Sequence, residues 1–265
     1  MLEFADSHCH LNYDGLREQT EAVLDRMRAA GVRRALNVCT TLQEADQVLA
    51  TAQAHDFLVC SVGVHPDYED ELEPTVEELV RRGQEPKVVA VGETGLDYFR
   101  LKGDLEWQRE RFRVHIRAAR ELGKPLIIHT REAPDDTLRI LKEEKADEVG
   151  GVMHCFTESI SVARQSVDLN FLVSLSGIVT FKNASQVHEV ARELPLENLM
   201  IETDSPFLAP VPFRGKTNEP AYVVHVAQRI ADLKGVSVEE VARVTTANFS
   251  RFVGEKKTPS TGRAL

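Results

Sequence analysis

Short apolar runs recur along the whole chain and alternate with longer amphipathic segments. The runs are rich in β-branched residues and are bounded by polar residues, a pattern that is typical of strands buried in a sheet. Eight runs follow this pattern, at residues 4–11, 35–41, 57–64, 87–92, 125–130, 150–156, 171–178 and 198–202. The alternation predicts a series of β-α units.

The segments between and after these runs have apolar residues at helical spacing. The clearest examples are residues 17–30, 107–122, 221–233 and 238–252. Ser237 precedes the last of them and Glu240 stands three residues later, which is the sequence pattern of a capping box. We therefore predict helices in these segments.

Eight β-α units close naturally into a parallel barrel with an outer ring of helices. We predict the α/β class and a single-domain (β/α)8 TIM barrel over residues 1–253, with a flexible C-terminal tail at 254–265. The alternative is an open doubly wound sheet, which usually has a glycine-rich phosphate turn after its first strand. Asp6-Ser7-His8-Cys9-His10 stands at that place instead, so the barrel is favoured.

The composition is that of an ordinary globular protein. The chain has 265 residues, 42% of them hydrophobic and 28% charged, which excludes a wholly disordered or collagen-like chain. The formal net charge of -10 argues against a broad basic surface for nucleic acid, because such binding needs Lys and Arg to neutralise phosphates. A local cationic site is still compatible with this charge.

The cellular location is predicted from three features that the sequence does not show: a membrane span, a signal peptide and paired cysteines. No apolar run reaches the roughly 20 residues that cross a bilayer, and the N-terminus has no basic start or apolar stretch of a signal peptide. The four cysteines, Cys9, Cys39, Cys60 and Cys155, form no CxxC pair and are expected to be reduced, buried thiols. We therefore expect a cytoplasmic protein.

Histidines on the first predicted strand are the first sign of chemistry. Side chains alternate along a strand, so His8 and His10 point to the same face, together with Asp6. Two imidazoles on one face can chelate a metal ion. An apolar strand that carries two hydrogen-bonded core histidines explains the pair equally well.

Further ionisable residues stand where other apolar runs end. His129 and His154 end the fifth and sixth runs, while Glu93 and Asp204 follow the fourth and eighth. The C-terminal ends of barrel strands meet at one mouth, so these residues become neighbours. Any one of these residues alone could simply cap a loop. Together, four histidines and two carboxylates offer more ligands than one tetrahedral zinc ion takes, and they suit two cations that share a bridging carboxylate.

With these positions in place, the chain resembles the TatD family of metal-dependent hydrolases, a deoxyribonuclease-type branch of the amidohydrolase barrels. The resemblance covers nearly the whole chain. It rests on the segments Asp6-Ser7-His8-Cys9-His10-Leu11, Gly63-Val64-His65-Pro66, Gly92-Glu93-Thr94-Gly95-Leu96-Asp97-Tyr98, Pro125-Leu126-Ile127-Ile128-His129-Thr130-Arg131, His154-Cys155-Phe156 and Glu202-Thr203-Asp204-Ser205-Pro206.

The resemblance implies a site for two divalent metal ions, which are zinc, magnesium or manganese. The first ion is implied to be held by His8, His10 and Asp204, the second by His129 and His154, with Glu93 bridging both.

Other residues are candidates for catalysis and substrate binding. Asp204 is the candidate base that accepts a proton from the attacking water, and Glu202, two residues earlier on the same face, competes for that role. His65 is either a hydrogen-bonding partner of a phosphate oxygen or a loop histidine. Arg131 and Arg214 are candidate phosphate contacts, with surface salt bridges as the alternative for each.

We expect a metal-dependent hydrolase acting on ester bonds, a deoxyribonuclease of the 3′–5′ exonuclease-like kind. Its substrate partner is single-stranded or frayed DNA, because a narrow barrel mouth accepts a strand end more easily than a duplex. The sequence indicates no membrane association and no obligate protein partner. One alternative is a hydrolase of a small amide, ester or phosphoester on the same two-metal site. Another is a metal-binding scaffold without turnover.

Overall fold

A computed structural model describes residues 2–69 and 71–255 of the chain. In these residues eight parallel strands pair in sequence order, β1 to β8. Their bounds are β1 Phe4–Cys9, β2 Val32–Asn37, β3 Leu58–Val62, β4 Val88–Asp97, β5 Leu126–Arg131, β6 Gly151–Met153, β7 Phe171–Leu175 and β8 Leu199–Ile201.

The sheet closes on itself just beyond its last strand. The amide of His10 donates to the carbonyl of Ser205 at 2.8 Å, and the amide of Asp204 donates to the carbonyl of His8 at 2.9 Å. These bonds join the end of β1 to the segment after β8. The predicted single-domain TIM barrel is therefore confirmed.

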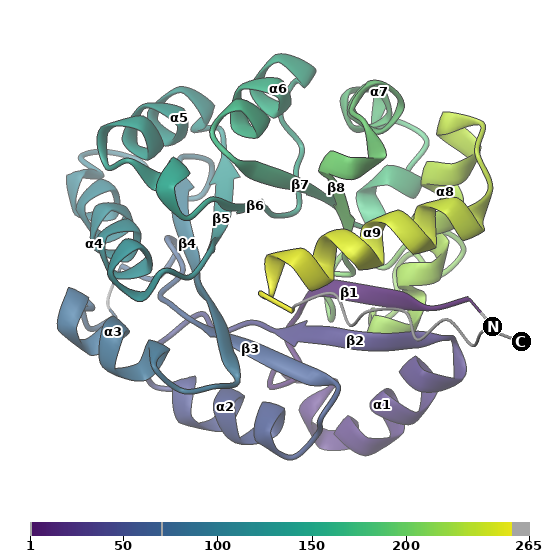
Figure 1. Cartoon of the computed structure of the whole chain (residues 1–265), viewed down its shortest axis with the longest axis horizontal. Helices are drawn as coiled ribbons and strands as arrows, with labels where there is room; N and C mark the ends of the chain where they lie inside the picture. Colours follow the sequence, from purple (N-terminus) through teal and green to yellow (C-terminus); the bar gives the residue numbers. More distant parts are fainter. Residues whose placement is uncertain (1, 70, 256–265) are drawn as a thin grey trace, which may run out of the picture.

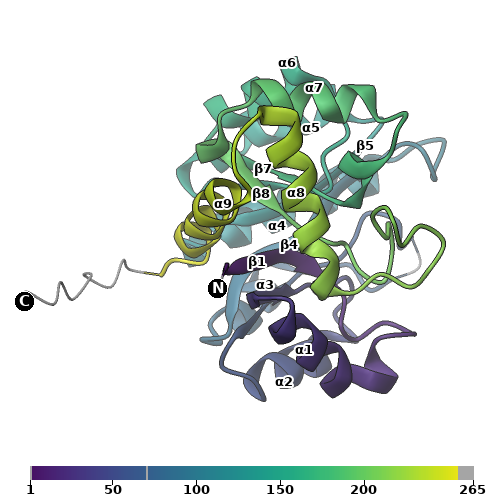
Figure 2. The same ribbon diagram turned by 90° about the vertical axis from the view of Figure 1, so that its right-hand side faces the viewer.

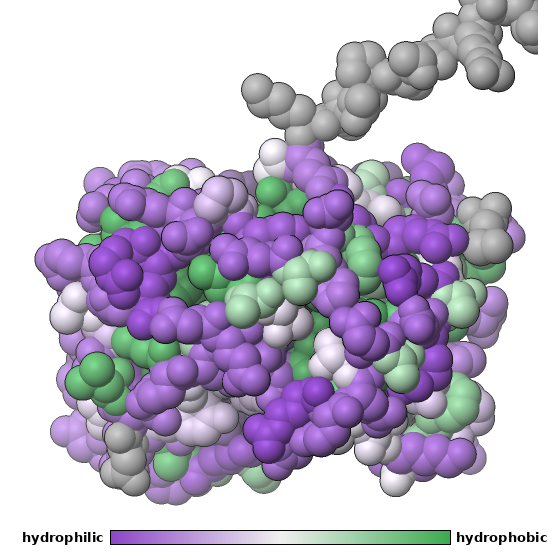
Figure 3. Space-filling model, turned by 90° about the horizontal axis from the view of Figure 1, so that it is seen from below, coloured by the Kyte–Doolittle hydropathy of each residue, from purple (hydrophilic) through white to green (hydrophobic). Residues whose placement is uncertain are grey.

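Helices surround the strands on the outside (Figure 1). Their bounds are α1 Thr20–Ala29, α2 Ala45–Gln53, α3 Val76–Gly83, α4 Glu106–Leu122, α5 Pro134–Glu143, α6 Ile160–Asp168, α7 Ser185–Glu193, α8 Val223–Lys234 and α9 Val238–Phe252. One face of the molecule is mostly hydrophilic, with apolar residues scattered among polar ones (Figure 3). This fits helices whose outer sides face solvent.

The barrel interior is a packed layer to which every strand contributes a buried apolar residue. These residues are Ala5, Leu36, Val59, Ala90, Ile127, Val152, Leu172 and Met200. Phe249 and Phe252 of α9 pack against the same layer. Figure 2 shows α9 at one end of the barrel, while the long connection between β8 and α8 lies at the other end. Helix α9 therefore closes one end and leaves the opposite mouth open.

The interior layer also sets where functional side chains point. Ile127 and Val152 are each followed two residues later by a histidine, His129 and His154, as strand alternation requires. In β1 and β4 the spacing is three, from Ala5 to His8 and from Ala90 to Glu93. Both strands have a register shift within that interval, so the extra residue is absorbed and the side chain still points inward.

The fourth strand differs from the sequence prediction. Residues 87–92 were expected, but β4 continues to Asp97 because Thr94, Leu96 and Asp97 pair with β5. Glu93 therefore lies inside a strand, and the expectation that it follows the strand was wrong. Residues 93–97 include glycines and polar side chains, which are unusual in a strand. They stay extended because their backbone pairs with that of β5.

Smaller differences concern element ends. Strand β2 begins at Val32 rather than residue 35, and it ends at Asn37 rather than residue 41. The first predicted helix divides into a 3₁₀ turn at Arg17–Gln19 and α1. The bounds of α9 match the prediction, and the Ser237 hydroxyl accepts a bond from the amide of Glu240 at 3.1 Å.

Three remaining expectations concern the tail, the cysteines and membranes. The tail at 254–265 lies outside the described residues apart from Gly254 and Glu255. The thiols of Cys9, Cys39 and Cys60 are free and buried, and that of Cys155 is free and partly buried. Among the helices of residues 2–69 and 71–255, none combines the length and apolar character that crossing a bilayer requires.

Candidate functional site

A cavity of about 590 Å³ opens at the C-terminal ends of the strands. Residues from the first, fourth, fifth, sixth and eighth strands or their following loops line it, including His10, Glu93, His129, His154 and Asp204. Sequence positions that are far apart thus share one pocket, as the strand-end positions predicted.

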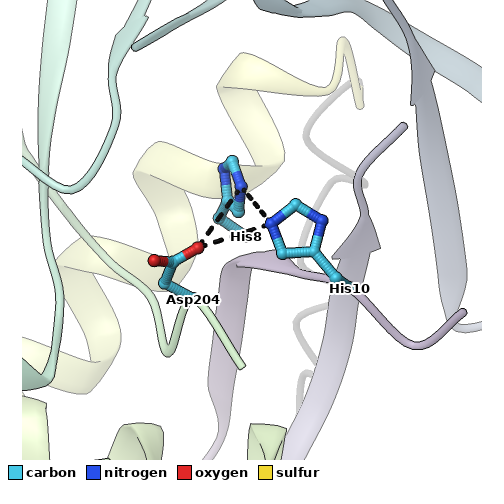
Figure 4. Close-up of side chains that lie close together, drawn as sticks. All are labelled: His8, His10 and Asp204. Carbon is cyan, nitrogen blue, oxygen red and sulfur yellow. Dashed lines mark hydrogen bonds and ion pairs between the residues drawn. The ribbon is translucent and has the colours of Figure 1, made fainter. Parts of the chain in front are cut away.

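One group of ligand atoms lies between β1 and the segment after β8 (Figure 4). The Nε2 atoms of His8 and His10 are 3.2 Å apart, and Oδ1 of Asp204 lies 3.8 Å from the first and 3.4 Å from the second. Two ring nitrogens and one carboxylate oxygen converge here on a single point. Imidazole and carboxylate are the donor types that zinc and other divalent ions accept in proteins.

A second group lies around Glu93. Its Oε1 is 3.0 Å from Nε2 of His154, 3.2 Å from Nδ1 of His129 and 3.2 Å from Nε2 of His65. Its other oxygen, Oε2, lies 3.2 Å from Nε2 of His8. The two carboxylate oxygens therefore face different sets of imidazoles, which is the arrangement of a carboxylate that can bridge two ions.

Burial and the neighbouring charges shift the pKa of the Glu93 carboxyl in opposite directions. Burial would raise the pKa of the Glu93 carboxyl, but the imidazoles of His154, His65 and His8 outweigh it and the pKa lies well below its usual value. Conversely, burial would lower the pKa of His154, while the carboxylates of Glu93 and Glu202 raise it well above 6.5. Glu93 is therefore a buried anion, available to cations.

Two further carboxylates contact the ring nitrogens of His154 and His129 that face away from Glu93. Oε1 of Glu202 lies 3.0 Å from Nδ1 of His154 and accepts a bond from the amide of Cys155 at 2.8 Å. Oδ2 of Asp97 lies 3.0 Å from Nε2 of His129. A carboxylate on the far ring nitrogen fixes the orientation of a metal-ligating histidine. Each histidine therefore presents its other nitrogen to Glu93.

Asp6 supports the segment that carries Asp204. Its carboxyl accepts bonds from the amide and the hydroxyl of Thr203, at 2.9 and 2.6 Å. Because Asp6 is fully buried, its pKa is raised to about 8 despite these bonds. Asp6 thus shares the first strand with His8 and His10 but acts on the neighbouring backbone.

The predicted substrate contacts divide into two kinds. His65 and Arg131 line the cavity, and the guanidinium of Arg131 lies 3.8 Å from the centre of the Phe99 ring. Arg214 stacks on Phe181 at 3.7 Å and is not among the residues that line the cavity. The three roles in phosphate binding stay predictions.

Sequence reasoning assigned no role to Asp97. The signal was present, because Glu93, Gly95 and Asp97 alternate as strand residues do. It was missed because the strand was expected to end at residue 92.

Comparison with known proteins agrees with this geometry. The family described as TatD related DNase matches residues 5–254. The chain is 49% identical over 250 residues to the uncharacterized metal-dependent hydrolase YcfH of Escherichia coli K12, covering 93% of this chain and 94% of that one. It is 44% identical over 250 residues to the uncharacterized metal-dependent hydrolase YabD of Bacillus subtilis, covering 93% and 97%.

A solved structure has the same fold. The crystal structure of YjjV, a TatD homologue from Escherichia coli K12, superimposes with a TM-score of 0.88 at 30% identity, covering 94% of this chain and 97% of that one.

Proposed function

This chain belongs to the TatD related DNase family of metal-dependent hydrolases, and on that premise we propose that it is a divalent-metal-dependent deoxyribonuclease. The substrate is single-stranded or frayed DNA, cleaved at a phosphodiester bond in the manner of a 3′–5′ exonuclease. The observation that carries the proposal is the division of the two Glu93 oxygens between two groups of imidazoles.

The side chains fit a pair of divalent ions. His8, His10 and Asp204 would hold the first. His129 and His154 would hold the second, and Glu93, whose two oxygens face the two groups, would be shared between the ions. The predominance of imidazole favours zinc over magnesium, with manganese between them. When bound, the ions stabilise negative charge on phosphoryl oxygens and make water a stronger acid.

Asp204 and Glu202 take different roles in this proposal. Asp204 lies at the cavity, its side chain is 15% exposed, and it is ionised because the nearby histidines keep its pKa below the usual value in spite of burial. It accepts the proton of the attacking water. Glu202 is fully buried and bonded to His154, so it is a positioning residue.

Two side chains at the cavity contact the substrate. The planar guanidinium of Arg131 suits a phosphate group, which it can bind through two parallel hydrogen bonds. His65 lines the same cavity, beside Glu93, and donates to a phosphate oxygen. Arg214 belongs to a second, outer contact with the DNA backbone, since it lies outside the cavity.

The size of the cavity supports a strand end as substrate. A volume of about 590 Å³ lies in the range of small-molecule sites, roughly 300–1,000 Å³, and is too small for a duplex. The same volume also favours the second candidate, a hydrolase of a small phosphoester, ester or amide.

The test is a panel of end-labelled single-stranded, duplex and nicked DNA, RNA and small esters, incubated with metal and with chelator. Glu93→Ala is expected to lose bound metal and to cleave DNA at least about 100-fold more slowly than the unchanged chain. Glu189→Ala removes an exposed carboxylate on α7 and serves as the control. Full cleavage by Glu93→Ala would overturn the two-ion site.

Two outcomes of the panel separate the alternatives. Equal rates on closed circular and linear single strands would contradict the end preference. Turnover of a small ester without release of nucleotides from any DNA would favour the second candidate.

A further inference from the structure

Helix α4 carries a stripe of buried polar side chains on the side that faces the barrel. Gln108, Arg111 and His115 are spaced so that they lie along one face of the helix, and their exposed fractions are 0%, 2% and 0%. A helix face packed against strands is usually apolar, because burying polar groups without partners is costly. The hydrogen-bond partners of these three side chains therefore indicate the role of the stripe.

The stripe binds the backbone of the loop that follows β3. Nε2 of His115 accepts a bond from the amide of Val64 at 2.9 Å. Arg111 donates to the carbonyl of His65 at 3.0 Å. Gln108 donates from its amide nitrogen to the carbonyl of Pro66 at 3.0 Å. Three consecutive residues of the loop are thus held by three side chains of one helix.

Gln108 also joins this loop to the end of β4. Its side-chain oxygen accepts a bond from the amide of Asp97 at 2.9 Å. The two segments tied by Gln108 each carry a side chain that contacts a candidate metal ligand: Nε2 of His65 lies 3.2 Å from Glu93, and Oδ2 of Asp97 lies 3.0 Å from His129.

The stripe is itself held in one arrangement. Nδ1 of His115 donates to the carbonyl of Arg111 at 2.8 Å, which leaves Nε2 as the acceptor. Burial lowers the pKa of His115 to about 4, so the ring is neutral and this tautomer persists at neutral pH. The guanidinium of Arg111 forms a two-bond pair with Glu73 and lies 4.7 Å from the centre of the Trp107 ring.

We propose that Gln108, Arg111 and His115 are positioning residues for the metal centre, which hold His65 and Asp97 in register with Glu93 and His129 through the backbone. They touch neither substrate nor metal. The inference rests on the proposed function in so far as it predicts an effect on catalysis. The claim that these residues hold His65 and Asp97 in place does not depend on which substrate is cleaved.

The experiment uses side chains of similar length that differ in hydrogen bonding. His115→Gln keeps an acceptor near the position of Nε2, whereas His115→Met removes it, and Gln108→Met removes both the donor and the acceptor of Gln108. Phe112→Leu is the control, because Phe112 is buried on the same helix and its side chain can form no hydrogen bond. Two measurements are made on each variant at a temperature where all are folded. They are hydrogen exchange of the Val64 and Asp97 amides without metal, because His115 accepts from the first and Gln108 from the second, and zinc affinity against a competing chelator.

His115→Met is expected to speed exchange of the Val64 amide about tenfold, and Gln108→Met that of the Asp97 amide, the effect of one lost hydrogen bond in each case. Their zinc affinity is expected to fall roughly tenfold to hundredfold, as for other residues behind a metal ligand. His115→Gln and Phe112→Leu are expected to keep both values near those of the unchanged chain.

Unchanged exchange and affinity in both methionine variants would overturn the inference, and so would an equal effect in Phe112→Leu. If His115→Met does not fold, Gln108→Met alone decides. Failure of the unchanged protein to cleave DNA would overturn the proposed function and leave these two measurements as the test of the inference.

Discussion

At the scale of single residues, the surroundings of a carboxylate decide what it can do. Glu93, Asp204 and Glu202 all lie among histidines, yet only Asp204 combines a place at the cavity with partial exposure. Glu202 is fully buried, and its Oε1 contacts Nδ1 of His154 and the amide of Cys155. In the proposed function, three carboxylates therefore have three different roles, which their neighbours determine: Glu93 would bridge the ions, Asp204 would accept a proton and Glu202 would orient His154.

This difference predicts separate effects for two amide variants. Asp204→Asn is expected to lower kcat by roughly 100-fold to 10,000-fold, the usual contribution of a general base. Glu202→Gln is expected to weaken metal affinity by about 10-fold to 100-fold, with kcat largely recovered at high metal concentration. Steady-state kinetics over a metal titration measures both effects. The reverse pattern, with metal rescue of Asp204→Asn only, would assign the base to Glu202.

At the scale of elements, the pairing of β4 with β5 determines the shape of the site. The extension of β4 to Asp97 places Glu93 and Asp97 on either side of the β5 histidine, His129. This close approach requires glycine at one position. Gly95 has a φ of 137°, and a Cβ atom there would lie 2.0 Å from the carbonyl oxygen of His129.

Gly95→Ala is therefore expected to destabilise the protein by several kcal/mol, about 3 or more, because β4 must move away from β5. Gly123→Ala is the matched control: Gly123 also has a positive φ, but a Cβ there meets nothing within 4 Å, so a loss of only about 1 kcal/mol is expected. Urea unfolding of both variants measures the difference. Equal midpoints for the two variants would show that β4 and β5 are not constrained at this point.

At the scale of the whole molecule, the barrel brings buried carboxylates and histidines from distant segments together at one mouth. The chain carries a formal net charge of -10, and three of its carboxylates, Glu93, Asp97 and Glu202, are buried at the site beside the histidines. In the proposed function, positive charge from bound metal would allow an acidic protein to act on a phosphodiester. Metal binding is also expected to stabilise the fold, because the site exists only in the folded chain.

Zinc added at 100 times its Kd is expected to stabilise the native state by about 2.7 kcal/mol. For a chain of this size that corresponds to a rise in Tm of roughly 5 to 10 °C. Calorimetry with chelator and with zinc measures the rise, and Glu93→Gln is expected to lose most of it. A rise of equal size in Glu93→Gln would show that zinc binds elsewhere.

Much of this protein is already readable from local patterns. The number of strands follows from the repeated apolar runs. The candidate ligands His129, His154 and Asp204 follow from their places at the ends of such runs, and His8 and His10 from strand alternation, because strand periodicity is a property of neighbouring residues. Other features depend on contacts between distant segments. The extension of β4 needs β5, the role of Glu202 needs His154, and the polar stripe of α4 has meaning only beside the loop after β3. Burial and hydrogen-bond partners come from tertiary packing, so no local pattern contains them.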